Sequence, residues 1–139
     1  MRLFQLDYTV LVVEDLDRAV AFYTDVLGIS LSHRTGGYAQ LVTGPTRLAL
    51  YTREAMAATL GRPIEPPPTP AHAAEGDAPL RDRFEIGFLV ADVDSAFAEI
   101  VAAGAAPVKE PTDRFWGQRT AYVRDPDGHL IELAQPLGD

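Results

Sequence analysis

The sequence predicts an α+β fold made of two tandem βαβββ modules. Three observations carry this prediction: an internal repeat, turn signals between short strands rich in β-branched residues, and a proline-rich segment between the halves. The repeat aligns Val13 with Val90 and Asp15 with Asp92. Both copies contain an apolar run, an Asp-x-Asp motif and then a helical pattern. We therefore interpret residues 1–139 as one domain of two related modules.

Each copy of the repeat begins with a predicted strand, at 6–13 and 85–90. An aspartate follows at the position of a helix N-cap, and a glycine (Gly28 or Gly104) ends the amphipathic pattern. The Thr-Gly-Gly and Asp-Pro-Asp-Gly sequences that follow in the two copies are typical of turns between strands. The remaining predicted elements are strands at 31–34, 38–43, 47–52, 107–110, 117–124 and 129–135 and a short helix at 53–60.

The segment at 61–82 contains six of the eleven prolines of the chain. Proline lacks a backbone N–H and has a fixed φ, so this composition excludes a helix or a central strand. We expect a surface linker there, between a first module at 1–60 and a second module at 83–139.

Composition narrows the classes of partner. With 20 acidic and 12 basic residues the net charge is −8, which argues against nucleic acid and against anionic membranes as partners. No cysteine is present, so disulfides, cysteine–zinc sites and thiol nucleophiles are excluded. The first residues lack the sustained apolar run of a signal peptide, and we expect a cytoplasmic protein.

Two motifs resemble a known family. The sequence Asp-Leu-Asp-Arg-Ala-Val-Ala-Phe-Tyr-Thr-Asp-Val-Leu-Gly at 15–28 is similar to the first-module signature of the vicinal oxygen chelate superfamily, which includes glyoxalase I, bleomycin resistance proteins and extradiol dioxygenases. Trp-Gly-Gln-Arg at 116–119 and Val-Arg-Asp-Pro-Asp-Gly-His-Leu-Ile-Glu-Leu at 123–133 resemble its C-terminal signature. The resemblance implies a curled mixed sheet with an open cup, and a homodimer. It does not specify the reaction, because the superfamily includes enzymes and binders.

The resemblance implies that, in metal-using members, four inward-facing positions meet at the floor of the cup. Carried over to this chain, the first-strand positions fall on Tyr8 and Glu85 and the last-strand positions on Glu132 and Leu50. Such members usually have histidine at the position of Tyr8, and a leucine cannot ligate. The implied metal ligands are therefore Glu85, Glu132 and Tyr8.

The chemistry of these three residues is unusual for a zinc or iron site, which neutral imidazole normally secures. An all-oxygen set favours magnesium or manganese held weakly. We therefore expect either no cofactor or a weakly held divalent metal (Mg, Mn, Zn or Fe). The three histidines, His33, His72 and His129, are interpreted as surface residues rather than ligands.

Aromatic residues suggest another use of the cup. Small-molecule pockets are lined mainly by apolar and aromatic side chains with a few polar groups. The predicted pocket residues are Tyr38, Leu50, Phe115, Trp116, Gln118, Arg119 and Tyr122. The alternatives are that Trp116 packs over the edge of the cup and that Tyr8 is a packed aromatic side chain of its strand.

Three functions are compatible with these features. The first is a protein that binds an aromatic or cationic small molecule without catalysis, as in antibiotic sequestration; the missing histidine, the acidity and the aromatic segment favour it. The second is a divalent-metal-dependent lyase, isomerase or dioxygenase, favoured by Glu85 and Glu132 and opposed by Tyr8. The third, a structural or regulatory module, has little support.

Overall fold

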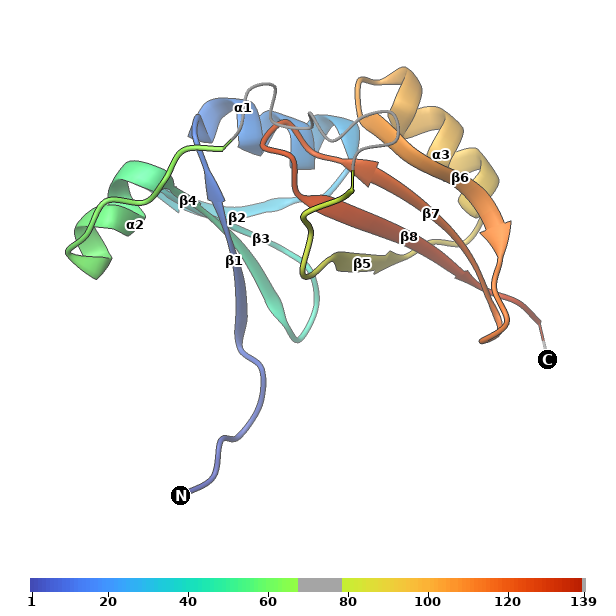
Figure 1. Ribbon diagram of the computed structural model, residues 1–139, viewed down its shortest axis with the longest axis horizontal. Helices are drawn as coiled ribbons and strands as arrows, with labels where there is room; N and C mark the ends of the chain where they lie inside the picture. The colour runs from blue at the N-terminus through green and yellow to red at the C-terminus, as the bar shows by residue number, and fades with distance from the viewer. Residues whose placement is uncertain (68–78, 139) are drawn as a thin grey trace. The chain divides into compact units, whose positions relative to one another are not determined.

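Two four-stranded mixed sheets form the frame of the computed structural model, which describes residues 1–67 and 79–138 (Figure 1). The chain divides into two compact units, 1–66 and 67–139, and we describe each by itself. The centre of the predicted linker and His72 lie outside the described residues. Both units have the strand and helix order of a βαβββ module, which confirms the predicted α+β fold.

The sheet of the first unit has the strand order β1-β4-β3-β2. Its first strand runs parallel to β4, and the other two pairs are antiparallel. Apolar side chains on one face of this sheet pack beneath the first helix, with Leu11 and Leu50 at most 1% exposed. The elements are β1 (Tyr8–Val13), α1 (Leu16–Ala21), η1 (Phe22–Val26), β2 (Leu31–Thr35), β3 (Tyr38–Leu41), β4 (Arg47–Thr52) and α2 (Arg53–Leu60).

The first helix begins as predicted and ends differently. The Asp15 side chain caps it by accepting a hydrogen bond from the N–H of Arg18. After Ala21 the helix widens into the π-helical turn η1, in which the N–H of Leu27 bonds the carbonyl of Phe22. The hydroxyl of Thr24 bonds a carbonyl of the preceding turn, and such a bond competes with the regular ladder. The predicted single α-helix to Gly28 is therefore divided in two.

The second unit repeats this arrangement with the strand order β5-β8-β7-β6. Asp92 caps α3 through the N–H of Ser95, as the repeat predicts. Two prolines lie in β6, which is longer than predicted because an edge strand with bulges tolerates proline. The elements are β5 (Ile86–Leu89), α3 (Val93–Ala102), β6 (Ala106–Asp113), β7 (Gln118–Arg124) and β8 (Leu130–Pro136).

A partly buried ion pair holds the segment that precedes β5 in the second unit. Both Nη atoms of Arg124 lie 2.8 Å from the carboxylate of Asp82, and Nη1 also bonds the carbonyl of Gly128. The Arg124 side chain is only 7% exposed. The turn at 125–128 closes as predicted, with Gly128 at φ 88°. His129 is not a surface residue, since its half-buried ring lies 2.7 Å from the Asp125 carboxylate.

Within the described residues, no helix is both long and apolar enough to span a membrane.

Candidate functional site

One face of the first sheet is buried in the core, and the other is partly exposed. Side chains alternate along β1, so Leu11 and Val13 enter the core, whereas Tyr8 and Val10 lie on the opposite face. Leu50 pairs with Leu11 and is 0% exposed, so it belongs to the core face. The prediction that Leu50 lines the ligand pocket is therefore wrong.

The register also corrects the fourth corner of the implied metal site. Glu132 stands opposite Gly87 in the second sheet, and the repeat places Gly87 on Val10. The residue opposite Val10 is Ala49, not Leu50. An alanine methyl has no donor atom, so this corner cannot ligate either.

The face that carries Tyr8 forms a pocket of about 620 Å³. Its lining comes from four strands and α2, so residues that are distant in the sequence meet in one pocket. This volume is in the range of sites for small organic molecules. The lining residues are Tyr8, Val10, His33, Tyr38, Gln40, Arg47, Tyr51, Met56 and Thr59, and we call this site the tyrosine pocket.

Tyr8 and Arg47 form a pair across the parallel strands β1 and β4. Nη1 of Arg47 donates a 2.8 Å hydrogen bond to the Tyr8 hydroxyl, and the guanidinium lies 4.8 Å from the centre of the Tyr8 ring. Nε of Arg47 lies 3.4 Å from the carboxylate of Asp7. The hydroxyl at the implied metal corner is thus already bonded to a cation.

Tyr38 lies at the centre of the aromatic lining. Its ring is 5.8 Å from His33 and 6.0 Å from Tyr51, and its hydroxyl donates to Gln40 at 2.9 Å. Partial burial raises the pKa of Tyr38, and a hydrogen bond with Tyr8 raises it further. Tyr38 therefore remains a neutral phenol at physiological pH.

The helix α2 completes the wall of the tyrosine pocket. Thr52 caps it by accepting from the N–H of Ala55, and the Tyr51 hydroxyl lies 2.7 Å from that of Thr59. Gly37 lies against this cap, since a Cβ added there would be 2.7 Å from Oγ1 of Thr52. The glycine thus allows the β2–β3 hairpin to approach the beginning of the helix.

The second unit brings together the two predicted glutamates. The Tyr122 hydroxyl donates a 2.8 Å hydrogen bond to Oε2 of Glu132. Gly87 leaves room for this carboxylate, because a Cβ there would lie 3.1 Å from Oε1. Partial burial raises the pKa of Glu85, and the charge of Glu132 and a hydrogen bond to it raise it further.

These donors do not fit zinc or iron. The second unit offers two carboxylates and a phenol, and Tyr8 belongs to the first unit. No group of three histidine, cysteine, aspartate or glutamate side chains suited to a metal occurs within residues 1–67 and 79–138. Neutral imidazole, which normally secures these ions, is missing from the donor set of Glu85 and Glu132.

The other predicted pocket residues lie at one end of the second sheet. Phe115 and Trp116 are 96% and 50% exposed at the β6–β7 turn, and the indole N–H donates to Gln118. Arg119 is held by two hydrogen bonds to Asp94 of α3, on the opposite face from Tyr122. Arg119 and Tyr122, both predicted as pocket residues, therefore do not share one face of the sheet.

Sequence reasoning missed seven of the nine residues that line the tyrosine pocket: Val10, His33, Gln40, Arg47, Tyr51, Met56 and Thr59. His33 is exposed, as predicted, yet its ring also contributes to this lining. The alternation of Arg47, Ala49 and Tyr51 along one strand was the available signal, because it puts the first and last on the face of Tyr8.

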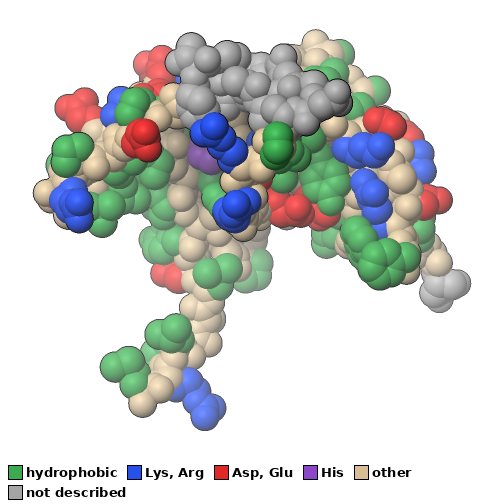
Figure 2. Space-filling view, viewed as in Figure 1, with side chains coloured by type: hydrophobic (Ala, Val, Ile, Leu, Met, Phe, Trp, Pro, Cys, Tyr) green, Lys and Arg blue, Asp and Glu red, His purple; other side chains and the backbone are tan. Residues whose placement is uncertain are grey.

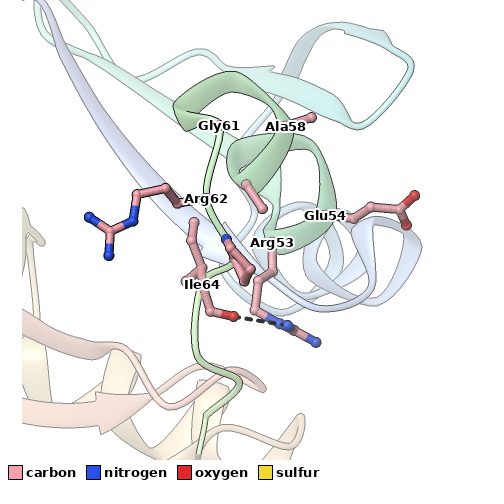
Figure 3. Close-up of a pocket in the computed structure, with 8 residues that line it drawn as sticks. Arg53, Glu54, Ala58, Gly61, Arg62 and Ile64 are labelled. Carbon is pink, nitrogen blue, oxygen red and sulfur yellow. Dashed lines mark hydrogen bonds between the residues drawn. The ribbon is translucent and has the colours of Figure 1, made fainter.

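A second hollow of about 590 Å³ lies between α2 and the segment that follows it (Figure 3). Arg53 spans it, with Nη1 donating to the carbonyl of Ile64 and Nε to Glu14. Its guanidinium is thus already engaged, so we assign no function to this hollow.

Comparison with known proteins identifies the family. The model of the Glyoxalase/Bleomycin resistance protein/Dioxygenase superfamily matches residues 5–133. The chain is 34% identical to the uncharacterized protein YraH of Bacillus subtilis, with 99% of this chain and 100% of YraH covered.

Relatives with functional names are more distant. A probable lactoylglutathione lyase of Vibrio cholerae is 31% identical, covering 92% of this chain and 88% of its own length. A bleomycin resistance protein of Geobacillus stearothermophilus is 28% identical, with coverages of 90% and 92%. In fold, the chain resembles a glyoxalase-related enzyme from Fulvimarina pelagi, with a TM-score of 0.78, 21% identity and coverages of 96% and 88%. The chain belongs to the Glyoxalase/Bleomycin resistance protein/Dioxygenase superfamily.

Proposed function

We propose that the protein binds a small aromatic molecule in the tyrosine pocket, without a metal ion. The observation that carries this proposal is the 2.8 Å bond between Arg47 and the Tyr8 hydroxyl. At the position where the family resemblance implies a metal ligand, this chain has a phenol bonded to a cation. The rings of Tyr38 and Tyr51 beside it offer stacking surfaces instead.

The composition of the lining supports binding over catalysis. Three tyrosines, Met56 and Val10 supply apolar area, and Gln40 and Thr59 supply polar groups that can orient a ligand. The name of the Geobacillus stearothermophilus relative, bleomycin resistance protein, is compatible with a role in sequestering a compound. Sequestration of an antibiotic is one form that this binding could take.

An enzyme is the second candidate, and one observation favours it. Glu85 lies beside Glu132, and its raised pKa makes it a candidate proton donor. The lyase name of the Vibrio cholerae relative points the same way. We rank this candidate below binding because the donor set does not fit zinc or iron.

A neutral aromatic probe tests the binding proposal. We expect 2-naphthamide to bind, and Tyr38→Leu to weaken its affinity about fivefold or more through loss of ring contacts. Tyr122→Leu is the matched control, because Tyr122 lies in the second unit. Isothermal titration calorimetry gives both affinities. An affinity lowered by Tyr122→Leu and unchanged by Tyr38→Leu would overturn the proposal.

A homodimer is part of the same proposal. Its support is an N-terminal segment with exposed apolar side chains, where Leu3 is 88%, Phe4 103% and Leu6 68% exposed (Figure 2). Such residues are commonly covered by a partner. Sedimentation velocity at micromolar concentration should give a dimer that Phe4→Asp weakens, and a strict monomer would contradict this part.

A further inference from the structure

The acidity of the chain is not shared by the tyrosine pocket. Residues 1–66 contain six arginines and seven acidic residues, so only −1 of the net charge of −8 lies in the first unit. The residues that line the pocket include Arg47 and His33 but no aspartate or glutamate. The pocket therefore favours a neutral or anionic ligand, whereas composition alone suggests a cationic one.

Arg47 has donor capacity that the described protein does not use. Its guanidinium carries five N–H groups, of which one bonds the Tyr8 hydroxyl and Nε faces Asp7. Across residues 1–67 and 79–138, the Arg47 side chain makes no other hydrogen bond or ion pair. Its side chain is 46% exposed, so a ligand in the pocket can reach the remaining N–H groups.

The pair with Tyr8 also limits the freedom of this cation. The hydroxyl holds Nη1, and the ring of Tyr8 lies beneath the guanidinium at 4.8 Å. A guanidinium restrained in this way loses less entropy when it binds a planar acceptor. A carboxylate matches the fork of two parallel N–H donors better than any neutral group.

The aromatic rings of the lining indicate the second chemical feature that a ligand needs. Tyr38, Tyr51 and His33 form the aromatic part of the same lining, with neighbouring ring centres 5.8–6.0 Å apart. A ligand that meets both the cation and the rings must combine a negative group with a flat apolar body. Its size is bounded by the 620 Å³ of the pocket.

We propose that the ligand class of the tyrosine pocket is an aromatic carboxylate, whose carboxylate is bound by Arg47 and whose rings lie against Tyr38 and Tyr51. This inference rests on the proposed function and specifies its ligand. It names Arg47 as the residue that determines specificity for charge.

Three probes of one shape test the inference: 2-naphthoate, the neutral 2-naphthamide and the cationic 2-naphthylmethylamine. We expect the order of affinity to follow charge, with naphthoate at least tenfold tighter than naphthamide and the amine weakest. Arg47→Gln should lower naphthoate affinity about 10- to 100-fold and naphthamide affinity less than threefold.

Arg62→Gln is the matched control, because Arg62 lies on the same unit but lines the other hollow (Figure 3). It removes the same net charge and should change no affinity by more than about twofold. Equal affinities of naphthoate and naphthamide, or equal losses with both arginine variants, would overturn the ligand class.

The failure of this inference differs from that of the proposed function. If naphthamide binds and Tyr38→Leu weakens it, but Arg47→Gln leaves naphthoate affinity unchanged, the aromatic site stands and the carboxylate assignment falls. If none of the three probes binds, both fall. Circular dichroism of Arg47→Gln verifies that the variant is folded.

Discussion

The hydroxyl of Tyr8 accepts a 2.8 Å hydrogen bond from Arg47, its register partner across β1 and β4. Tyr8 stands at the strand position where the family resemblance implies a histidine in metal-using members. A phenol in that environment orients a cation rather than a metal ion.

Tyr8→Phe should separate orientation from ring contact. The phenylalanine keeps the aromatic face beneath Arg47 and removes only the hydroxyl acceptor. We expect 2-naphthoate affinity to fall about fivefold, which corresponds to one ordinary hydrogen bond of about 1 kcal/mol. Isothermal titration calorimetry measures the change. Affinity for 2-naphthamide serves as the control, and an equal loss for both probes would show that the hydroxyl does not act through Arg47.

Gly37→Ala should destabilise the first unit by about 1 kcal/mol or more. The new Cβ would lie 2.7 Å from Oγ1 of Thr52 and would displace this side chain from the N-cap of α2. Thermal unfolding measures the loss, and probe affinity should fall with it because α2 carries Met56 and Thr59. Gly138→Ala is the control, since a Cβ added at Gly138 would meet no heavy atom within 4 Å. Equal unfolding temperatures for both variants would contradict this account of Gly37.

Asp82→Asn should destabilise the protein by about 2–3 kcal/mol at pH 7, because it leaves the guanidinium of Arg124 buried without its anion. The hydrogen bond from Arg124 holds the pKa of Asp82 below its ordinary value. The stability from this carboxylate is therefore present above the pKa of an unfolded aspartate and is lost as pH falls through the lower folded pKa.

The difference between wild type and Asp82→Asn should accordingly shrink as the pH is lowered through that acidic range. Urea unfolding at a series of pH values measures it. A difference that stays constant down to the lowest pH would mean that the ion pair is not its source. Asp94→Asn is a suitable control, because the Asp94–Arg119 pair is exposed and contributes less.

Metal retention separates the two candidate functions. We expect the dialysed protein to hold zinc, iron, manganese or magnesium far below one equivalent, because Glu85 and Glu132 lack an imidazole partner. Elemental analysis by mass spectrometry measures this content. One equivalent of a divalent metal that resists dialysis and is lost in Glu132→Gln would favour the enzyme.

Most of the fold followed from the sequence. Asp15 and Asp92 cap helices because a short carboxylate side chain reaches the free N–H groups of the first turn. This effect is local and does not depend on what the helix packs against. The π-turn at Phe22–Val26 was not predicted, since hydrophobic periodicity does not reveal the hydrogen bond from the Thr24 hydroxyl to the preceding turn.

The site was predicted less well than the fold. Glu85, Glu132 and Tyr122 lie together because Tyr122 pairs with Glu132 across β7 and β8, and Glu85 lies two residues before Gly87, which pairs with Glu132 across β5 and β8. Leu50 and Arg119 were misplaced because a shift of one residue in register moves a side chain to the other face. Pairing across strands, which a single sequence does not show, decides this register.

Mapping a bound ligand onto the backbone tests the central claim most directly. In a titration of ¹⁵N-labelled protein with 2-naphthoate, we expect the largest amide shift changes at Tyr38, Gln40, Arg47 and Tyr51, the lining of the tyrosine pocket. Shift changes confined to the second unit, around Glu85, Tyr122 and Glu132, would contradict the account.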